Sequence, residues 1–248
     1  SGVAEGAMAF MLALLKKVRE RDQYVKDGNW RDESLQGSFL GRRQDGYEGI
    51  TIGIIGLGRI GSRLADLLAP WRVRLIAYDP YKGDQQFIHH DVERVELDEL
   101  LAQSDVVTLH TNLTAETRGL MGAAELAKMK ETAYLLNTSR GAVVDENALF
   151  DALDRDQIAG AAIDVFEEEP LPKQSALLGL GNKILLSPHV ITFNVGAGLT
   201  PAIPWATEHV IQAMKGEVPE HVYSEAVIDR WVERFGGQEA IVFQEQRL

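Results

Sequence analysis

Cysteine is absent from the 248 residues of this chain. This absence excludes disulfide bonds, thiolate zinc sites and a cysteine nucleophile. It is compatible with a reducing compartment, and we therefore expect a cytoplasmic protein. We also expect no metal site, because the adjacent histidines His89 and His90 have no evident third ligand in the sequence.

Basic residues are scarce relative to acidic ones, with 25 Lys and Arg against 37 Asp and Glu and a net charge of −12. This balance opposes non-specific binding to nucleic acid or to anionic lipid.

Long apolar runs are also missing, and the run from Met8 to Leu15 is too short to span a membrane. Basic residues follow this run and do not precede it, unlike those of a signal peptide. We expect neither nucleic acid nor membrane as a partner, and we interpret the run as a core or dimer face.

Apolar residues make up 45% of the chain, enough for a globular core. Short β-rich apolar runs alternate with helical patterns, which is typical of a parallel sheet covered on both faces. We therefore predict an α/β fold with a doubly wound parallel sheet of the Rossmann type. Strands are expected at 49–55, 74–78, 106–110, 133–137, 159–165 and 183–186, and helices at 3–21, 60–68, 97–103, 123–129, 146–153 and near 205–215. Residues 22–47 are polar and are interpreted as a connecting arm around Trp30.

A glycine-rich turn follows the first predicted strand and opens the next helix: Gly56-Leu57-Gly58-Arg59-Ile60-Gly61. In this pattern the first glycine permits a tight turn, the second lets the backbone approach a pyrophosphate, and the third lets helix and strand pack closely. The N-terminus of the helix offers free N–H groups to the phosphates. The turn therefore predicts a dinucleotide site.

An acidic residue, Asp79, lies 18 residues after Gly61, at the end of the second predicted strand. A carboxylate in this position can accept hydrogen bonds from the ribose hydroxyls and would repel a 2′-phosphate. The cofactor predicted from this pair of signals is NAD, not NADP. The alternative is a flexible glycine-rich turn beside a solvated carboxylate.

Three further motifs lie at or just after predicted strand ends. They are Asn137-Thr138-Ser139-Arg140-Gly141, the segment from Gly160 to Pro170 containing Asp164 and Glu169, and Ser187-Pro188-His189. Together with the glycine-rich turn, their order and spacing resemble the signatures of the D-isomer-specific 2-hydroxy acid dehydrogenases, including the phosphoglycerate dehydrogenases.

The resemblance implies an NAD-dependent oxidoreductase that interconverts a small D-2-hydroxy acid and its 2-oxo acid by hydride transfer. It assigns catalysis to Arg140 as the carboxylate anchor and to Glu169 and His189 as the acid–base pair. A guanidinium suits a carboxylate and an imidazole suits proton transfer near neutral pH. The resemblance also implies a homodimer joined through the nucleotide-binding domain. The cofactor-binding residues it implies are Gly56, Gly58, Arg59, Ile60, Gly61, Asp79, Thr111, Thr138, Arg140 and Asp164.

Other interpretations remain open. Arg140 could instead form a structural ion pair with Asp145, and the chain could be an NAD(H)-sensing, corepressor-like regulator or a formate- or phosphite-type dehydrogenase. The sequence departs from the family pattern at Asn112, where the family usually has proline, and at the bulky Phe193 after His189.

The resemblance also suggests how the chain is divided. We expect an NAD-binding domain at 1–192, followed at 193–248 by a C-terminal return helix and tail that belong to the substrate lobe. Because the family has a first lobe before the nucleotide domain, we interpret the chain, which starts at Ser1, as lacking that lobe. We therefore expect little turnover from this chain alone.

Overall fold

The computed structural model describes residues 2–40, 49–193, 203–219 and 228–236. The chain divides into two compact units, Ser1–Thr192 and Phe193–Leu248. Within the described residues, no helix has both the length and the apolar character needed to cross a membrane.

The first unit is built on one sheet of seven parallel strands in the order β3-β2-β1-β4-β5-β6-β7. The strands are β1 (Thr51–Ile55), β2 (Arg74–Tyr78), β3 (Glu93–Arg94), β4 (Val106–Leu109), β5 (Tyr134–Asn137), β6 (Gly160–Ile163) and β7 (Ile184–Leu186). The strand order reverses between β1 and β4, which creates a crevice at the carboxyl ends of these strands. The predicted doubly wound parallel sheet is confirmed.

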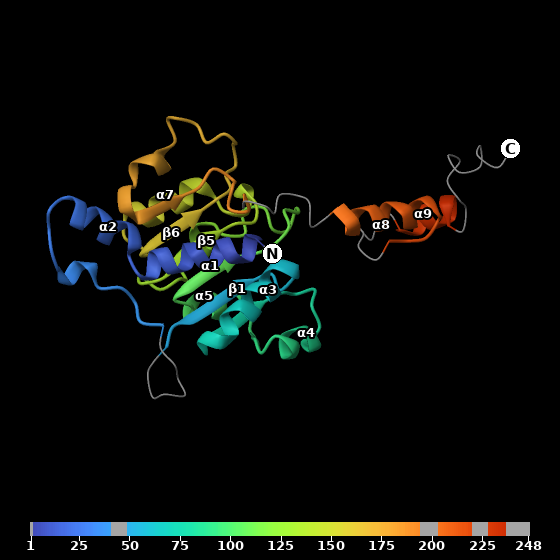
Figure 1. The fold of residues 1–248 in the computed structure, drawn as a ribbon, viewed down its shortest axis with the longest axis horizontal. Coiled ribbons are helices and arrows are strands. Elements are labelled where there is room, and N and C mark those ends of the chain that lie inside the picture. Colours follow the sequence, from blue (N-terminus) through green and yellow to red (C-terminus); the bar gives the residue numbers. More distant parts are fainter. Residues whose placement is uncertain (1, 41–48, 194–202, 220–227, 237–248) are drawn as a thin grey trace. The chain divides into compact units, whose positions relative to one another are not determined.

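Helices cover both faces of the sheet, because neighbouring residues of each buried strand point to opposite sides. Leu135 packs into one apolar cluster, and the next residue, Leu136, packs into the other. The first cluster includes residues of α5 (Leu97–Gln103), α6 (Ala123–Leu126) and α7 (Glu146–Asp154). The second includes residues of α1 (Gly2–Leu15), α3 (Arg59–Leu68) and α4 (Asp84–His89). Figure 1 shows α1, in blue, lying across the sheet near β5 and β6.

The prediction of one helix over 3–21 was wrong. Two helices form instead, α1 and α2 (Val18–Lys26), and Lys17 between them has a left-handed backbone with φ of 49°. The break is held from outside the helix: Lys16 Nζ donates to Ser38 O, and Lys17 Nζ donates to Ser34 O, each at 2.8 Å. The arm then passes through a short 3₁₀ turn, η1 (Glu33–Leu35).

Two elements were not predicted, α4 and β3. Residues 84–89 form α4, and β3 contains only two exposed residues, which carry no apolar signature. Most other boundaries were predicted within two residues. Asp145 caps α7, and its Oδ1 accepts from Asn147 N and Ala148 N at 3.0 Å.

The second unit contains two described helices, α8 (Ile203–Met214) and α9 (Ile228–Phe235). The helix predicted near 205–215 corresponds to α8. In the tail, where no element was predicted, α9 places Trp231 and Phe235 on one side with ring centroids 6.0 Å apart. The tail residues 224–227 and 237–248 lie outside the described residues.

Candidate active site

The carboxyl ends of five adjacent strands meet at one edge of the sheet. The register pairs Ile55 with Leu109, Leu109 with Asn137, Asn137 with Ile163, and Ile163 with Leu186. The residues that follow these strand ends therefore lie along one line. The glycine-rich turn and the motifs at Asn137 and Ser187 begin on this line or directly after it, and the segment from Gly160 to Pro170 crosses it.

The glycine-rich turn has the geometry that its sequence predicts. Gly56 has φ of +92°, a conformation that residues with a side chain rarely adopt. A Cβ on Gly61 would lie 2.1 Å from Gly56 O, so only glycine lets α3 start this close to β1. At Gly58, by contrast, no heavy atom of the described residues, apart from those of its two chain neighbours, lies within 4 Å of the position of a Cβ. The second glycine of this motif is the one at which the backbone approaches a pyrophosphate, and the open space leaves room for that approach.

Asp79 lies against this turn and is only 8% exposed. One carboxylate oxygen accepts from Leu57 N at 2.9 Å, and the other accepts from Tyr81 N at 3.0 Å. The sequence indicated a ribose acceptor but did not show that the same carboxylate holds the glycine turn. A carboxylate has about four acceptor sites, so these two bonds leave capacity for ribose hydroxyls.

Three buried polar atoms on the segments that follow β4 and β5 have no hydrogen-bond partner in the described structure: Thr111 Oγ1, Thr138 Oγ1 and His110 Nδ1. Buried polar atoms are nearly always hydrogen-bonded, so unsatisfied ones that gather beside a crevice indicate a site for a polar ligand. Together with the open space at Gly58, these atoms fit a dinucleotide. The predicted cofactor residues Thr111 and Thr138 are among them, whereas sequence reasoning did not single out His110.

Glu169 and His189, which are 20 residues apart in the chain, form a hydrogen-bonded pair. His189 Nδ1 lies 2.7 Å from Glu169 Oε2, and Glu169 Oε1 accepts from Phe166 N at 2.9 Å. These contacts, with the His189 bond as the largest cause, lower the pKa of the Glu169 carboxyl below its ordinary value. The positive charge of Arg140 contributes in the same direction. The carboxylate is therefore ionised at neutral pH and can orient the imidazole ring.

Asp164 holds the chain that follows His189. Its carboxylate is 1% exposed and accepts from Val190 N at 3.1 Å and from Ile191 N at 3.3 Å. His189 itself has φ of 56°, which is unusual for a residue that is not glycine. The two bonds to Asp164 stabilise the segment directly after this strained residue. This contact was not predicted, because the resemblance assigned Asp164 only to the cofactor.

Arg140 follows β5 on a tightly bonded loop. Asn137 Nδ2 donates to Arg140 O at 2.9 Å, and Arg140 Nη1 donates to Ser139 O at 2.7 Å. The alternative interpretation paired Arg140 with Asp145, but Asp145 caps α7, and the described residues contain no ion pair between the two. A Cβ on Gly141 would lie 1.9 Å from the carbonyl carbon of Phe166. This close approach joins the Arg140 loop to the loop that carries Glu169.

An apolar cavity of about 580 Å³ lies beside the histidine–glutamate pair. Apart from Glu169 and His189, its lining was not predicted, because the leucines involved come from three separate segments. The lining residues are Phe166, Glu169, Pro170, Leu171, Leu178, Leu186, Ser187, Pro188 and His189.

The remaining predicted residues lie at the start of α3, where Arg59 is exposed and Ile60 is half-buried. Away from the site, His90 Nδ1 contacts Asp66 Oδ1 at 2.7 Å, and the rings of His89 and His90 meet edge to face. In the part of the chain that the structure describes, no group of three or more His, Cys, Asp or Glu side chains could hold a metal ion.

Residues 8–190 match the model of the family described as D-isomer specific 2-hydroxyacid dehydrogenase, NAD binding domain. The chain belongs to this family. Among curated relatives, it is 39% identical over 227 residues to a glyoxylate reductase of Thermofilum pendens, covering 91% of this chain and 66% of the relative. It is 37% identical over 213 residues to a D-3-phosphoglycerate dehydrogenase of Archaeoglobus fulgidus, covering 86% of this chain and 39% of the relative. The chain thus spans a little less than two thirds of the first relative and about two fifths of the second.

A solved structure with a similar fold is that of the D-lactate dehydrogenase of Aquifex aeolicus, complexed with NAD and lactic acid. The two structures match with a TM-score of 0.74 at 31% identity, and the match covers 86% of this chain and 66% of that chain. The family match confirms the resemblance that the sequence motifs indicated and identifies the seven-stranded sheet as the NAD-binding domain of the D-isomer specific 2-hydroxyacid dehydrogenases.

Proposed function

We propose that this chain is the NAD-binding part of an oxidoreductase that interconverts a small D-2-hydroxy acid and its 2-oxo acid. The observation that carries the proposal is the 2.7 Å contact between His189 Nδ1 and Glu169 Oε2, on the sheet edge that also bears the glycine-rich turn. The relatives named glyoxylate reductase, D-3-phosphoglycerate dehydrogenase and D-lactate dehydrogenase support the substrate class.

In this proposal Arg140 anchors the substrate carboxylate. Its side chain is exposed, and its guanidinium can grip a carboxylate with two parallel hydrogen bonds. The influence of its charge on the pKa of Glu169 supports a position near the acid–base pair. The anchor would therefore place the substrate's C2 oxygen within reach of His189.

His189 would exchange the proton of the substrate. Because its Nδ1 is engaged with Glu169, Nε2 is the ring nitrogen that gives a proton to the carbonyl oxygen in reduction and takes it from the hydroxyl in oxidation. Glu169 stays ionised and stabilises the charged ring before that transfer. Bound NAD supplies the hydride acceptor and NADH the hydride donor, and the residues that would hold either form are those of the glycine turn, Asp79, Thr111 and Thr138.

The test is calorimetry in two stages, which requires no turnover. NADH should bind with micromolar or somewhat weaker affinity and NADPH far more weakly, because Asp79 would repel a 2′-phosphate. Oxamate, an unreactive analogue of a 2-oxo acid, should then bind only to the NADH complex and should lose affinity in Arg140→Ala. Tighter binding of NADPH than of NADH would contradict the assignment of Asp79. Oxamate binding that is equally tight in wild type and in Arg140→Ala would contradict the role of Arg140 as the carboxylate anchor.

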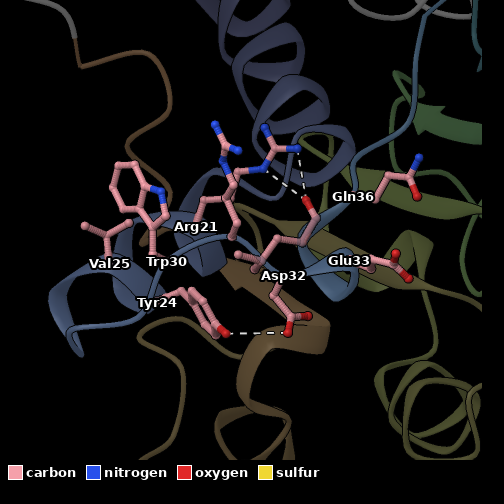
Figure 2. A pocket seen from close by; sticks show the side chains of 9 residues that line it. Arg21, Tyr24, Val25, Trp30, Asp32, Glu33 and Gln36 are labelled. Atoms are coloured by element: carbon pink, nitrogen blue, oxygen red, sulfur yellow. Dashed lines mark hydrogen bonds between the residues drawn. The ribbon is translucent and has the colours of Figure 1, made fainter.

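We also propose a homodimer formed through the nucleotide-binding unit, with the arm that follows α1 at the interface. Trp30 is 75% exposed and Val25 is 52% exposed. Exposed apolar side chains that gather on one surface are typical of a contact site. Figure 2 shows these two side chains next to each other beside a cavity of about 820 Å³. The arm is held in shape by Arg21, whose Nε and Nη2 donate to Leu35 O at 3.1 and 2.9 Å.

Sedimentation should therefore give the mass of two chains, and Trp30→Glu should give the mass of one without unfolding the protein. A wild-type chain that sediments as a monomer would contradict the dimer.

We further propose a cytoplasmic location, which the lack of cysteine supports. The proposed division assigns 1–192 to the NAD-binding domain and 193–248 to the return helix and tail of the substrate lobe.

A further inference from the structure

The apolar cavity beside the acid–base pair contains side chains that the proposed mechanism does not use. Its volume is about 580 Å³, within the range of about 300–1,000 Å³ that is typical of small-molecule sites. Glu169 and His189 belong to its lining, together with Phe166 and a group of leucines and prolines. A 2-oxo acid whose C2 oxygen lies at His189 is therefore already at the wall of this cavity.

The fold holds the wall of the cavity in place without a ligand. Phe166 is buried, and Leu171 and Leu186 pack against the apolar cluster that contains it. Phe166 N also donates to Glu169 Oε1 at 2.9 Å, so one short loop positions both the apolar wall and the carboxylate that orients His189. A preformed wall next to a proton donor is suited to select substrates by shape and polarity.

Leu178 lines the cavity from the 3₁₀ turn η5 (Ala176–Gly179) and is 52% exposed. Its neighbours Leu177 and Leu180 are buried in the same apolar cluster, so these two residues attach the segment to the core. The side chain of Leu178 is not needed for that attachment. An apolar side chain left exposed beside the other apolar groups of a cavity is typical of a surface that contacts a ligand.

The charges around the cavity disfavour an anionic ligand group. In the part of the chain that the structure describes, no lysine or arginine lines the cavity, whereas the Glu169 carboxylate does. A phosphate or a second carboxylate placed here would leave water without gaining a cationic partner of its own, and Glu169 would repel it. An alkyl or aryl group has neither cost and gains free energy from leaving water.

We propose that this cavity receives the third substituent on C2 of the substrate, and that the substrates are 2-oxo acids with an alkyl or aryl side group, not phosphorylated or dicarboxylic ones. C2 of a 2-oxo acid carries a carboxylate, an oxygen and one further group. Arg140 and His189 take the first two in the proposed mechanism, which leaves the third for the cavity. This inference rests on the proposed function, because it requires the substrate to be held by those two residues.

Binding of three unreactive compounds to the NADH complex, measured by calorimetry, tests this selection. Oxamate has no group for the cavity, N-propyloxamate adds three carbons, and N-oxalylglycine adds a carboxylate at a similar distance. Full burial of three carbons strengthens binding about 60-fold. Because the wall at Leu178 is half exposed, we expect N-propyloxamate to bind about 5- to 50-fold more tightly than oxamate. N-oxalylglycine should bind no more tightly than oxamate.

Leu178→Lys should reverse the order of the two longer compounds, because its ammonium group supplies the cationic partner that the carboxylate of N-oxalylglycine lacks. Ile88→Lys is the matched control, since it adds the same charge at a side chain that is 68% exposed on α4 and does not line the cavity. This control should keep the preference of the wild type for N-propyloxamate. An unchanged preference in Leu178→Lys would overturn the role of the cavity.

Methyl NMR of labelled leucines locates the propyl group in the wild-type chain, independently of how the variants fold. N-propyloxamate should shift the resonances of Leu171, Leu178 and Leu186 more than oxamate does, and equal shifts with the two compounds would refute the placement.

Oxamate binding with no gain from the propyl group, or tighter binding of N-oxalylglycine than of N-propyloxamate to the wild type, would overturn this inference and leave the proposed function standing. Failure of the proposed function is seen in a different measurement, an oxamate affinity that is equal in wild type and Arg140→Ala.

Discussion

Replacing Gly58 with alanine should separate cofactor affinity from fold stability. Apart from its chain neighbours, no described residue has an atom within 4 Å of the added Cβ, and Gly58 has φ of −81°, which alanine adopts without strain. The substitution reduces the freedom of the unfolded chain, so we expect stabilisation of about 0.4–1 kcal/mol. For a unit of this size this corresponds to a rise in melting temperature of roughly 1–4 °C.

The same methyl group would occupy the space that a diphosphate needs. Forcing an extra methyl group into a close contact costs about 1–3 kcal/mol. At 1.4 kcal/mol for each factor of ten, NADH affinity should fall about 5- to 150-fold, measured by calorimetry. Gly58→Ala should therefore melt at a slightly higher temperature than wild type and bind NADH much more weakly.

Two other glycines provide matched controls. A Cβ on Gly179 also meets nothing within 4 Å, but Gly179 lies in the 3₁₀ turn η5 (Ala176–Gly179), so Gly179→Ala should leave NADH affinity unchanged. A Cβ on Gly61 would meet the backbone of the turn at 2.1 Å, so Gly61→Ala should lower both stability and affinity. If Gly58→Ala binds NADH as tightly as wild type, the backbone there does not approach the diphosphate and our account of the turn is refuted.

Three further predictions concern ionisable groups. His189→Ala should raise the pKa of the Glu169 carboxyl toward its ordinary value in a carbon NMR titration, because the His189 bond is the largest cause of its lowering; an unchanged value would contradict the pairing. Asp164→Ala removes the acceptor of two backbone amides, so we expect a loss of about 3 kcal/mol or more in urea unfolding, and a loss under about 1 kcal/mol would exclude a holding role. Finally, the pKa of His110 is lowered from 6.5 to about 4, so the unfolded chain takes up its proton first as the pH falls. Stability should then decrease between pH 6.5 and pH 4 by about 3 kcal/mol from this group, and His110→Asn should lose this part of the pH dependence in urea unfolding.

Much of the fold was predictable because its elements carry local signals. The strand Arg74–Tyr78 and the helix Leu97–Gln103 were predicted with their observed bounds, since buried parallel strands are apolar runs and amphipathic helices repeat with a 3.6-residue period. The break at Lys17 was not predictable in this way, because the groups that hold it, Ser34 and Ser38, lie 17 and 22 residues further along the chain. Such distant contacts do not change the local pattern of apolar residues from which a helix is predicted.

The same distinction applies to the site. The glycine-rich turn and the three other motifs could be identified because each is a short segment with a required spacing. The bonds from Asp164 to the segment after His189, and from Asp79 to Leu57, could not be identified, since they join segments more than 20 residues apart. The unsatisfied nitrogen of His110 is also invisible in the sequence, because it depends on burial and on which ring nitrogen Thr108 engages.

The contact at Gly141 has a consequence for how selectivity could change in this enzyme family. Because the backbone of Gly141 rests directly on that of Phe166, the segment with the proposed carboxylate anchor and the segment with Glu169 cannot shift independently. The distance between the proposed anchor and the proposed proton donor then stays constant. This suits the separation between the carboxylate and the C2 oxygen, which is the same in all 2-hydroxy acids. A change of substrate would have to come from side chains that contact the rest of the substrate, with this distance unchanged.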